Sequence, residues 1–198
     1  MKNEDVLEEI GNIGSGKAAK ALSEFSGKLI THKKPKVVVI KKSMDYLKLF
    51  ESNSEILASI VEFSGDLNGT ACLIFPTYDA FTLIGLISKQ TKVDIKEYIK
   101  EYWNTYSEIS NIVIGAYLSA VSDFSDIGIL QEVPHSIFGP VTQVIRIFTK
   151  LLGSKMNSGI CIQTQLNIQN EQIKGFFILS LDQANIEKLL KKAEQKAK

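Results

Sequence analysis

Two residue patterns near the start of the chain could support chemistry. The first is GNIGSGKA, Gly11 to Ala18, which differs by one residue from the phosphate-binding pattern G-x-x-x-x-G-K-[ST]. A phosphate-binding loop follows a strand and uses a Ser or Thr hydroxyl to reach magnesium. Here the preceding segment MKNEDVLEEI favours a helix, and Ala18 has no hydroxyl. A nucleotide hydrolase that depends on Lys17 is therefore the weakest of the alternatives.

The second pattern is a polar stripe formed by Asp5, Glu9 and Asn12. On a helix these side chains lie within about 60° of one another, while Ile10 and its apolar neighbours point away from them. Gly16 follows one turn after Asn12 on the same face, although a glycine within a helix costs about 1 kcal/mol relative to alanine. We expect the bare backbone to let another macromolecule approach the Asn12 carboxamide closely.

The whole pattern recurs 99 residues later without a gap. Five positions have counterparts: Asn104 for Asp5, Glu108 for Glu9, Asn111 for Asn12, Gly115 for Gly16 and Pro134 for Pro35. One polar face at the start of a helix is explained by the helix dipole, but the second stripe begins about ten residues into its expected helix, where the dipole no longer acts. The repetition predicts pseudo-twofold symmetry and a shared function for the two stripes.

The remaining patterns predict the elements that carry the stripes. Strand-like runs cover residues 36–40, 56–63, 69–75, 158–168 and 174–181, and helical patterns cover residues 77–90, about 95–124 and 182–198. Each half therefore reads as helix, strands, helix. We predict an α/β fold, a single two-layer domain over residues 1–198. Two pseudo-repeats, about 1–93 and 94–198, would place long exposed helices on a central β-sheet.

Composition excludes several classes of function. The chain has 23 basic and 22 acidic residues and a net charge of +1, which gives no footprint for nucleic acid. Cys72 and Cys161 lie in apolar runs without ligands at metal spacing, so we expect reduced core residues and no metal site. No apolar run reaches the ~20 residues needed to span a bilayer, and the acidic start lacks a signal peptide pattern. These features predict a cytoplasmic protein without membrane insertion.

Other reactive or bulky residues form no competing site. His32 and His135 adjoin the two prolines, without a nucleophile or acid at triad spacing, and are expected to be exposed loop residues. Tyr102, Trp103 and Tyr106 are expected to serve core or helix packing and not partner contact. The stripes therefore remain the candidate site.

The pattern D-x-x-x-E-x-x-N with a downstream proline resembles the signature of the CheC, CheX and FliY family of chemotaxis phosphatases. Asp5, Glu9, Asn12 and Pro35 match it fully; the second copy matches at Glu108, Asn111 and Pro134, with Asn104 where the family usually has Asp or Ser. Two sites in a chain of this length, without the additional flagellar-switch domain of FliY-type members, resemble the CheC type.

The resemblance implies hydrolysis of the aspartyl phosphate on the chemotaxis response regulator CheY. Asn12 and Asn111 would orient the attacking water, and Glu9 and Glu108 would pair with the regulator's active-site lysine. Asp5, Asn104 and the two prolines would support these contacts. The resemblance implies no cofactor of the chain's own, because the regulator supplies Mg²⁺. The alternative is a non-catalytic module that binds the phosphorylated regulator or regulates the receptor deamidase CheD, with which CheC proteins are associated.

Overall fold

The apolar runs of the sequence form one antiparallel sheet, and the amphipathic segments form helices that cover it. The computed structural model describes residues 3–51, 53–88, 95–152 and 158–196. The first half contains α1 (Asn3–Ser26), β1 (Ile30–His32), β2 (Lys36–Ile40), the 3-10 helix η1 (Ser43–Leu49), β3 (Glu55–Gly65), β4 (Gly69–Pro76) and α2 (Thr77–Ile87). The second half contains α3 (Ile95–Ser125), β5 (Ile129–Gln131), β6 (His135–Pro140), α4 (Val141–Leu152), β7 (Ser158–Ile168), β8 (Glu171–Leu181) and α5 (Gln183–Lys196).

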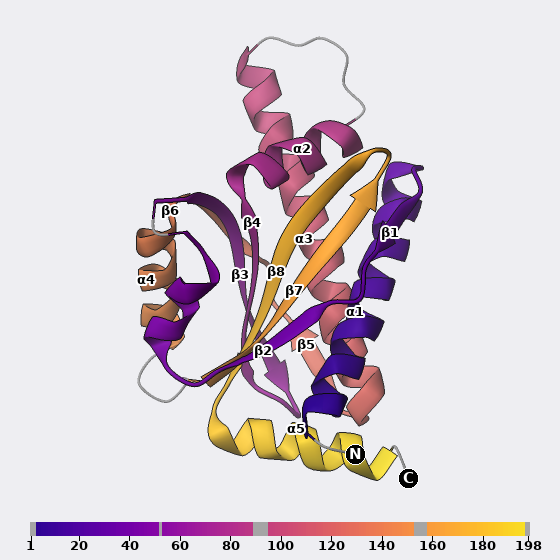
Figure 1. Ribbon diagram of the computed structural model, residues 1–198, viewed down its shortest axis with the longest axis vertical. Helices are drawn as coiled ribbons and strands as arrows, with labels where there is room; N and C mark the ends of the chain where they lie inside the picture. The colour runs from indigo at the N-terminus through magenta and orange to yellow at the C-terminus, as the bar shows by residue number, and fades with distance from the viewer. Residues whose placement is uncertain (1–2, 52, 89–94, 153–157, 197–198) are drawn as a thin grey trace.

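The sheet joins the two halves through their strands. Its order is β1-β7-β8-β4-β3-β5, with β2 also paired to β7 and β6 also paired to β3. Every pairing among the described strands is antiparallel. The short strands that follow α1 therefore pair with a long strand of the second half, and those that follow α3 pair with a long strand of the first half (Figure 1).

Two apolar clusters hold the layers together. The larger cluster lies between one face of the sheet and helices α1, α2, α3 and α5, and it includes Leu22, Ile109 and Phe177. The smaller cluster lies on the other face beneath α4 and η1, where the rings of Tyr46 and Phe148 meet edge to face at 5.4 Å. α1 and α3 lie side by side and run in opposite directions across the larger cluster, with α5 beneath them (Figure 1).

Most predicted elements are confirmed, including the α/β fold with its central sheet and the long helix, which runs from Ile95 to Ser125. Cys72 and Cys161 are buried and not bonded to each other, as predicted. The structure adds β1, β5, β6, η1 and α4, which the sequence interpretation did not identify. The order of elements is similar in the two halves, but the division into pseudo-repeats stays a prediction, and its boundary at residues 93 and 94 lies outside the described residues.

Candidate functional site: two polar stripes on paired helices

Helices α1 and α3 bond directly to each other beside the sheet. The Ser15 Oγ lies 2.8 Å from the Tyr117 hydroxyl, and the Thr164 hydroxyl of β7 donates to Ser15 at 3.2 Å. The Tyr117 ring stacks on Phe177 with a centroid separation of 4.3 Å. Burial raises the pKa of Tyr117 to about 12. These contacts fix the two helices relative to each other and to the sheet.

The first stripe faces solvent along α1. The side chains of Asp5, Glu9 and Asn12 are exposed, whereas the intervening Ile10 is buried in the larger cluster. Next to Asn12, Gly11 lets the helix approach the sheet: a Cβ on Gly11 would lie 3.2 Å from Val37 and 3.3 Å from Ile162. The three stripe side chains therefore lie on the solvent-facing side of α1.

The second stripe has the same exposure on α3. Asn104, Glu108 and Asn111 are exposed, although a different packing supports them. Ser110, the counterpart of Gly11, is buried and accepts a hydrogen bond from Ser59 of β3 at 2.8 Å. Hydroxyl contacts at this site thus replace the methyl contacts beneath the first stripe.

The loops that carry the two prolines have matching anchors. The Lys33 backbone N–H donates to the Gln165 carbonyl of β7 at 3.0 Å, and the Glu132 N–H donates to the Glu62 carbonyl of β3 at 3.0 Å. Pro35 is buried, and its Cγ would lie 3.5 Å from a Cβ on Gly11; Pro134 is half-buried. Each loop therefore lies against a long strand of the other half, and the first loop reaches the helix next to Asn12.

The two stripe glycines are half-buried because a side chain from the adjoining strand lies beside each. A Cβ on Gly16 would lie 3.4 Å from the His32 Nε2, and one on Gly115 would lie 3.6 Å from the Gln131 Oε1. His32 ends β1 and is half-buried, so its prediction as an exposed loop residue was wrong. The counterpart His135 is exposed but begins β6.

The glycine-rich segment that resembled a phosphate-binding loop is the middle of α1. A Cβ on Gly14 would lie only 2.3 Å from the Tyr117 ring, so this glycine permits the close approach of α3. The Lys17 ammonium donates to the Ser119 hydroxyl at 2.9 Å and pairs with Asp123. The hydrogen bond from Lys17 to the Asp123 carboxylate lowers the pKa of Asp123. The lysine joins two helices, and its segment does not form a loop.

A second ion pair lies beside the first stripe. The Lys34 ammonium donates to the Glu8 carboxylate at 2.9 Å, and this bond, with the charges of Glu8 and Glu9, raises the pKa of Lys34. Sequence interpretation missed Lys34. Its position immediately before Pro35 was the available signal, because the proline loop was already expected near the stripe.

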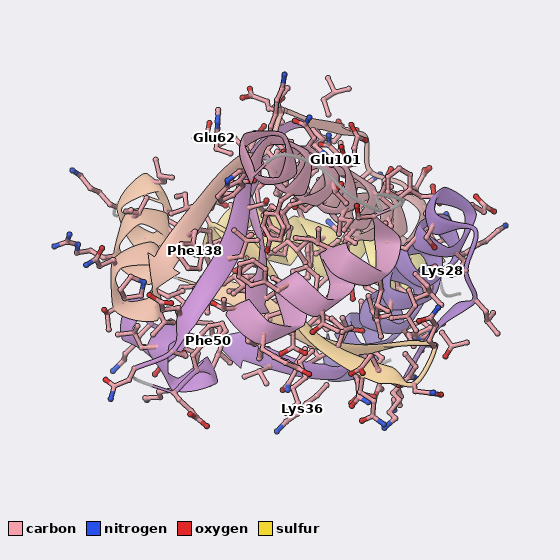
Figure 2. The ribbon with its side chains drawn as sticks, turned by 90° about the horizontal axis from the view of Figure 1, so that it is seen from above. Lys28, Lys36, Phe50, Glu62, Glu101 and Phe138 are labelled. Carbon is pink, nitrogen blue, oxygen red and sulfur yellow. The ribbon has the colours of Figure 1, made fainter. Side chains whose placement is uncertain are left out.

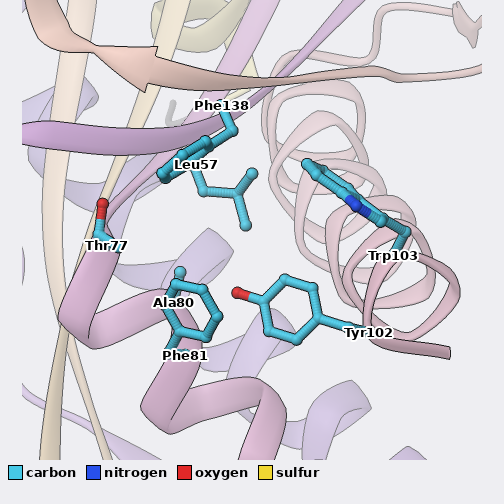
Figure 3. Close-up of a pocket in the computed structure, with 7 residues that line it drawn as sticks. All are labelled: Leu57, Thr77, Ala80, Phe81, Tyr102, Trp103 and Phe138. Carbon is cyan, nitrogen blue, oxygen red and sulfur yellow. The ribbon is translucent and has the colours of Figure 1, made fainter. Parts of the chain in front are cut away.

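The aromatic residues ahead of the second stripe are only partly in the core. Tyr106 is buried and Tyr102 is half-buried, whereas Trp103 is 37% exposed and packs edge to face against both tyrosines of its own helix, in agreement with the predicted core or helix packing. It lines an apolar pocket of about 180 Å³ with six other residues, Leu57, Thr77, Ala80, Phe81, Tyr102 and Phe138. Figure 3 shows the rings of Trp103 and Phe138 on facing sides of this pocket.

In the part of the chain that the structure describes, no three His, Cys, Asp or Glu residues are grouped so that they could hold a metal ion. None of the described helices combines the length and the apolar composition that crossing a membrane requires.

Comparison with known proteins places this geometry in a family context. Residues 3–39, which contain the first stripe and Pro35, match the CheC-like family. The chain is 27% identical over 191 residues to the CheY-P phosphatase CheC of Bacillus subtilis, and the match covers 93% of this chain and 90% of that protein. The resemblance to the CheC, CheX and FliY family is confirmed.

Solved structures of other flagellar proteins share this fold. FliY from Thermotoga maritima superposes with a TM-score of 0.74 at 17% identity, covering 98% of this chain and 97% of the FliY chain. The FliM middle domain from H. pylori superposes with a TM-score of 0.60 at 12% identity, covering 96% of this chain and 98% of that domain. At these identities the likeness shows the fold alone, so function must be argued from the stripes.

Proposed function

We propose that this protein hydrolyses the aspartyl phosphate of a CheY-type response regulator. The observation that carries the proposal is the pair of exposed stripes, Glu9 with Asn12 and Glu108 with Asn111, in one register on adjacent helices. The similarity to the CheY-P phosphatase CheC, which extends over most of both chains, supports the same activity.

The exposed position of the stripes suits a protein substrate. A side chain on the outside of a long helix can enter the active site of a second protein, whereas a small substrate is usually enclosed in a pocket. Glu9 and Glu108 would pair with the regulator's active-site lysine and fix its orientation, a role that contributes register more than affinity. Asp5 and Asn104 lie one turn before these glutamates and would support this contact.

The chemistry needs little from the phosphatase. An acyl phosphate is already activated, so hydrolysis requires a water in line with phosphorus and stabilisation of the transferring oxygens. The carboxamides of Asn12 and Asn111 would hold that water, as a glutamine does in GTPases. The regulator would supply Mg²⁺ and its lysine, and the products would be inorganic phosphate and the free aspartate.

Phosphate release from phosphorylated, Mg²⁺-loaded CheY tests the proposal. We expect substoichiometric wild-type protein to accelerate release, and the double variant Asn12→Ala with Asn111→Ala to lose about 100-fold or more of that acceleration, because misplacing a reacting group by ~1 Å has an effect of this size. The single variants rank the two sites. Gln143→Ala is the matched control, since it removes an exposed helical carboxamide on α4, on the other side of the sheet.

Binding to the phosphorylated regulator separates catalysis from capture. We expect the double variant to bind nearly as tightly as wild type, because the glutamates and the surrounding surface are intact. Undiminished turnover in the double variant would disprove the water-positioning role. Binding without any acceleration by wild type would instead favour a non-catalytic module, and a parallel assay with CheD would test the regulatory form of that alternative.

A further inference from the structure

The residues that precede the two prolines differ in charge although their positions correspond. Residues 32–34 are His-Lys-Lys and residues 131–133 are Gln-Glu-Val. We call these tripeptides the first and second rims. Lys33, Lys34, Glu132 and Val133 are all exposed, and the matching backbone bonds of Lys33 and Glu132 hold the two rims in the same register. The rims therefore present different chemistry at equivalent places.

The first rim places two ammonium groups beside its stripe, Lys33 and Lys34. Lys34 bonds Glu8, next to Glu9, while His32 lies over Gly16, one turn beyond Asn12. Lys33 adds a second exposed ammonium. The loop side of the first stripe therefore carries lysines, one of them already bonded to a carboxylate of α1.

The second rim is acidic and apolar. Gln131 lies over Gly115 in the place of His32, Glu132 replaces a lysine, and Val133 is 75% exposed. A separate apolar pocket lies on the same helix, where Trp103 precedes Asn104 and forms a pocket wall with Phe138, which is 47% exposed (Figure 3). This site offers apolar contact area where the first offers ammonium groups.

Charged residues next to the rims can be located in Figure 2, which is seen from above: Lys36 lies at the lower edge and Glu62 at the upper edge. Charges around a binding site act mainly on the association rate and on its dependence on salt. Apolar contacts lack this dependence at moderate ionic strength. Salt should therefore distinguish the two sites.

We propose that the two sites select different response-regulator surfaces. The first prefers a regulator surface that carries carboxylates opposite Lys33 and Lys34, and the second prefers a regulator surface that is apolar opposite Val133. This inference rests on the proposed function for the identity of the partner. The rims, and not the catalytic Glu and Asn, set the selection.

The single-site variants make the test possible. Asn111→Ala leaves the first site to act and Asn12→Ala leaves the second, and kcat/KM for phosphorylated cognate CheY is measured from low to high NaCl. We expect first-site kcat/KM to fall about tenfold and second-site kcat/KM to change by less than about twofold, the range expected for rim charges. Equal salt dependence at the two sites would overturn the inference.

Exchanging the two rims tests whether their residues cause the difference in salt dependence. His32→Gln, Lys33→Glu and Lys34→Val are placed in the Asn111→Ala background, and we expect the salt dependence of the first site to disappear. In the Asn12→Ala background, Gln131→His, Glu132→Lys and Val133→Lys should confer it. Lys41→Glu with Lys42→Gln in the Asn111→Ala background changes net charge as much as the first exchange, away from the rims, and should leave the salt dependence of kcat/KM unchanged. A salt dependence that does not change when the rims are exchanged would overturn the proposal.

A binding assay separates this inference from the proposed function. CheY carrying Mg²⁺ and beryllofluoride, a stable phosphate mimic, is titrated against the same variants, whose folding is checked by thermal melting. Rim-dependent salt sensitivity of binding without any hydrolysis would support the inference and refute the phosphatase. Hydrolysis whose salt dependence is the same with either rim would support the phosphatase and refute the inference. Absence of both binding and hydrolysis would refute both.

Discussion

Two glycines in the middle of α1 should respond to alanine with opposite signs. A Cβ on Gly14 would lie 2.3 Å from Cδ1 and 2.7 Å from Cε1 of Tyr117, well inside van der Waals contact. The ring cannot move away easily, because it is buried and stacked on Phe177 at 4.3 Å. Overpacking of this kind destabilises by about 1–3 kcal/mol, and a clash against a fixed ring belongs at the upper end. The helical preference for alanine returns about 1 kcal/mol, so we expect Gly14→Ala to destabilise by about 2 kcal/mol.

Gly16→Ala is the matched control within the same helix. Its Cβ would lie 3.4 Å from the His32 Nε2, at the end of a side chain that can shift, so the helical preference should stabilise by up to about 1 kcal/mol. Urea denaturation followed by circular dichroism measures the free energy of unfolding of both variants. In thermal melts their midpoints should differ by about 6–12 °C, given ~2–4 °C per kcal/mol for a chain of this size. If Gly14→Ala were as stable as Gly16→Ala, the assigned contact between α1 and Tyr117 would be wrong. In a Tyr117→Ala background the clash is absent, so Gly14→Ala should no longer destabilise and should stabilise by up to about 1 kcal/mol, as at Gly16, although the truncation itself destabilises.

Two further predictions follow from the helix pair. We expect calorimetry to detect no ATP binding to wild type or to Lys17→Ala. The substitution should destabilise by less than about 1 kcal/mol, because the Asp123 partner is largely solvated. ATP binding to wild type that is lost in Lys17→Ala would restore the phosphate-loop interpretation. For Tyr117, burial raises the pKa from its unfolded value near 10 to about 12, so its protonated hydroxyl contributes stability that is present below pH ~10 and lost as pH rises through 12. Urea denaturation across this pH range should show wild type losing more stability than Tyr117→Phe, and parallel losses would contradict the assignment.

The extent to which sequence predicted the fold depended on the length of each signal. Long apolar strands and the repeated helices were readable because their periodicity extends over many residues. β1 and β5 have three residues each, too few for a period, and they are strands only because β7 and β3 provide partners. The helix α4 was a different case, since Val141, Val144, Ile145 and Phe148 show helical spacing that was present but not used.

The candidate site was predicted in part for similar reasons. Spacing along one helix is a local property, so the exposed faces of Asp5, Glu9 and Asn12 could be derived from the sequence alone. The side chains that surround the stripe come from the loop before Pro35, and their contacts with α1 depend on how that loop lies against β7. Such tertiary contacts have no signature in local spacing. The role of each stripe residue stays a prediction until the variants are measured.

The exchange of short strands between the halves determines when each site can be completed during synthesis. The α1 stripe is made well before β7, yet β1 and β2, which flank the loop of Pro35, pair with β7 alone among the described strands. The α3 stripe differs, because its loop joins β3, which has been made long before. Contacts so distant in sequence form slowly and late in folding. The first site to leave the ribosome is therefore the last to be assembled, and a truncated chain that lacks β7 would expose α1 without the loop that surrounds it.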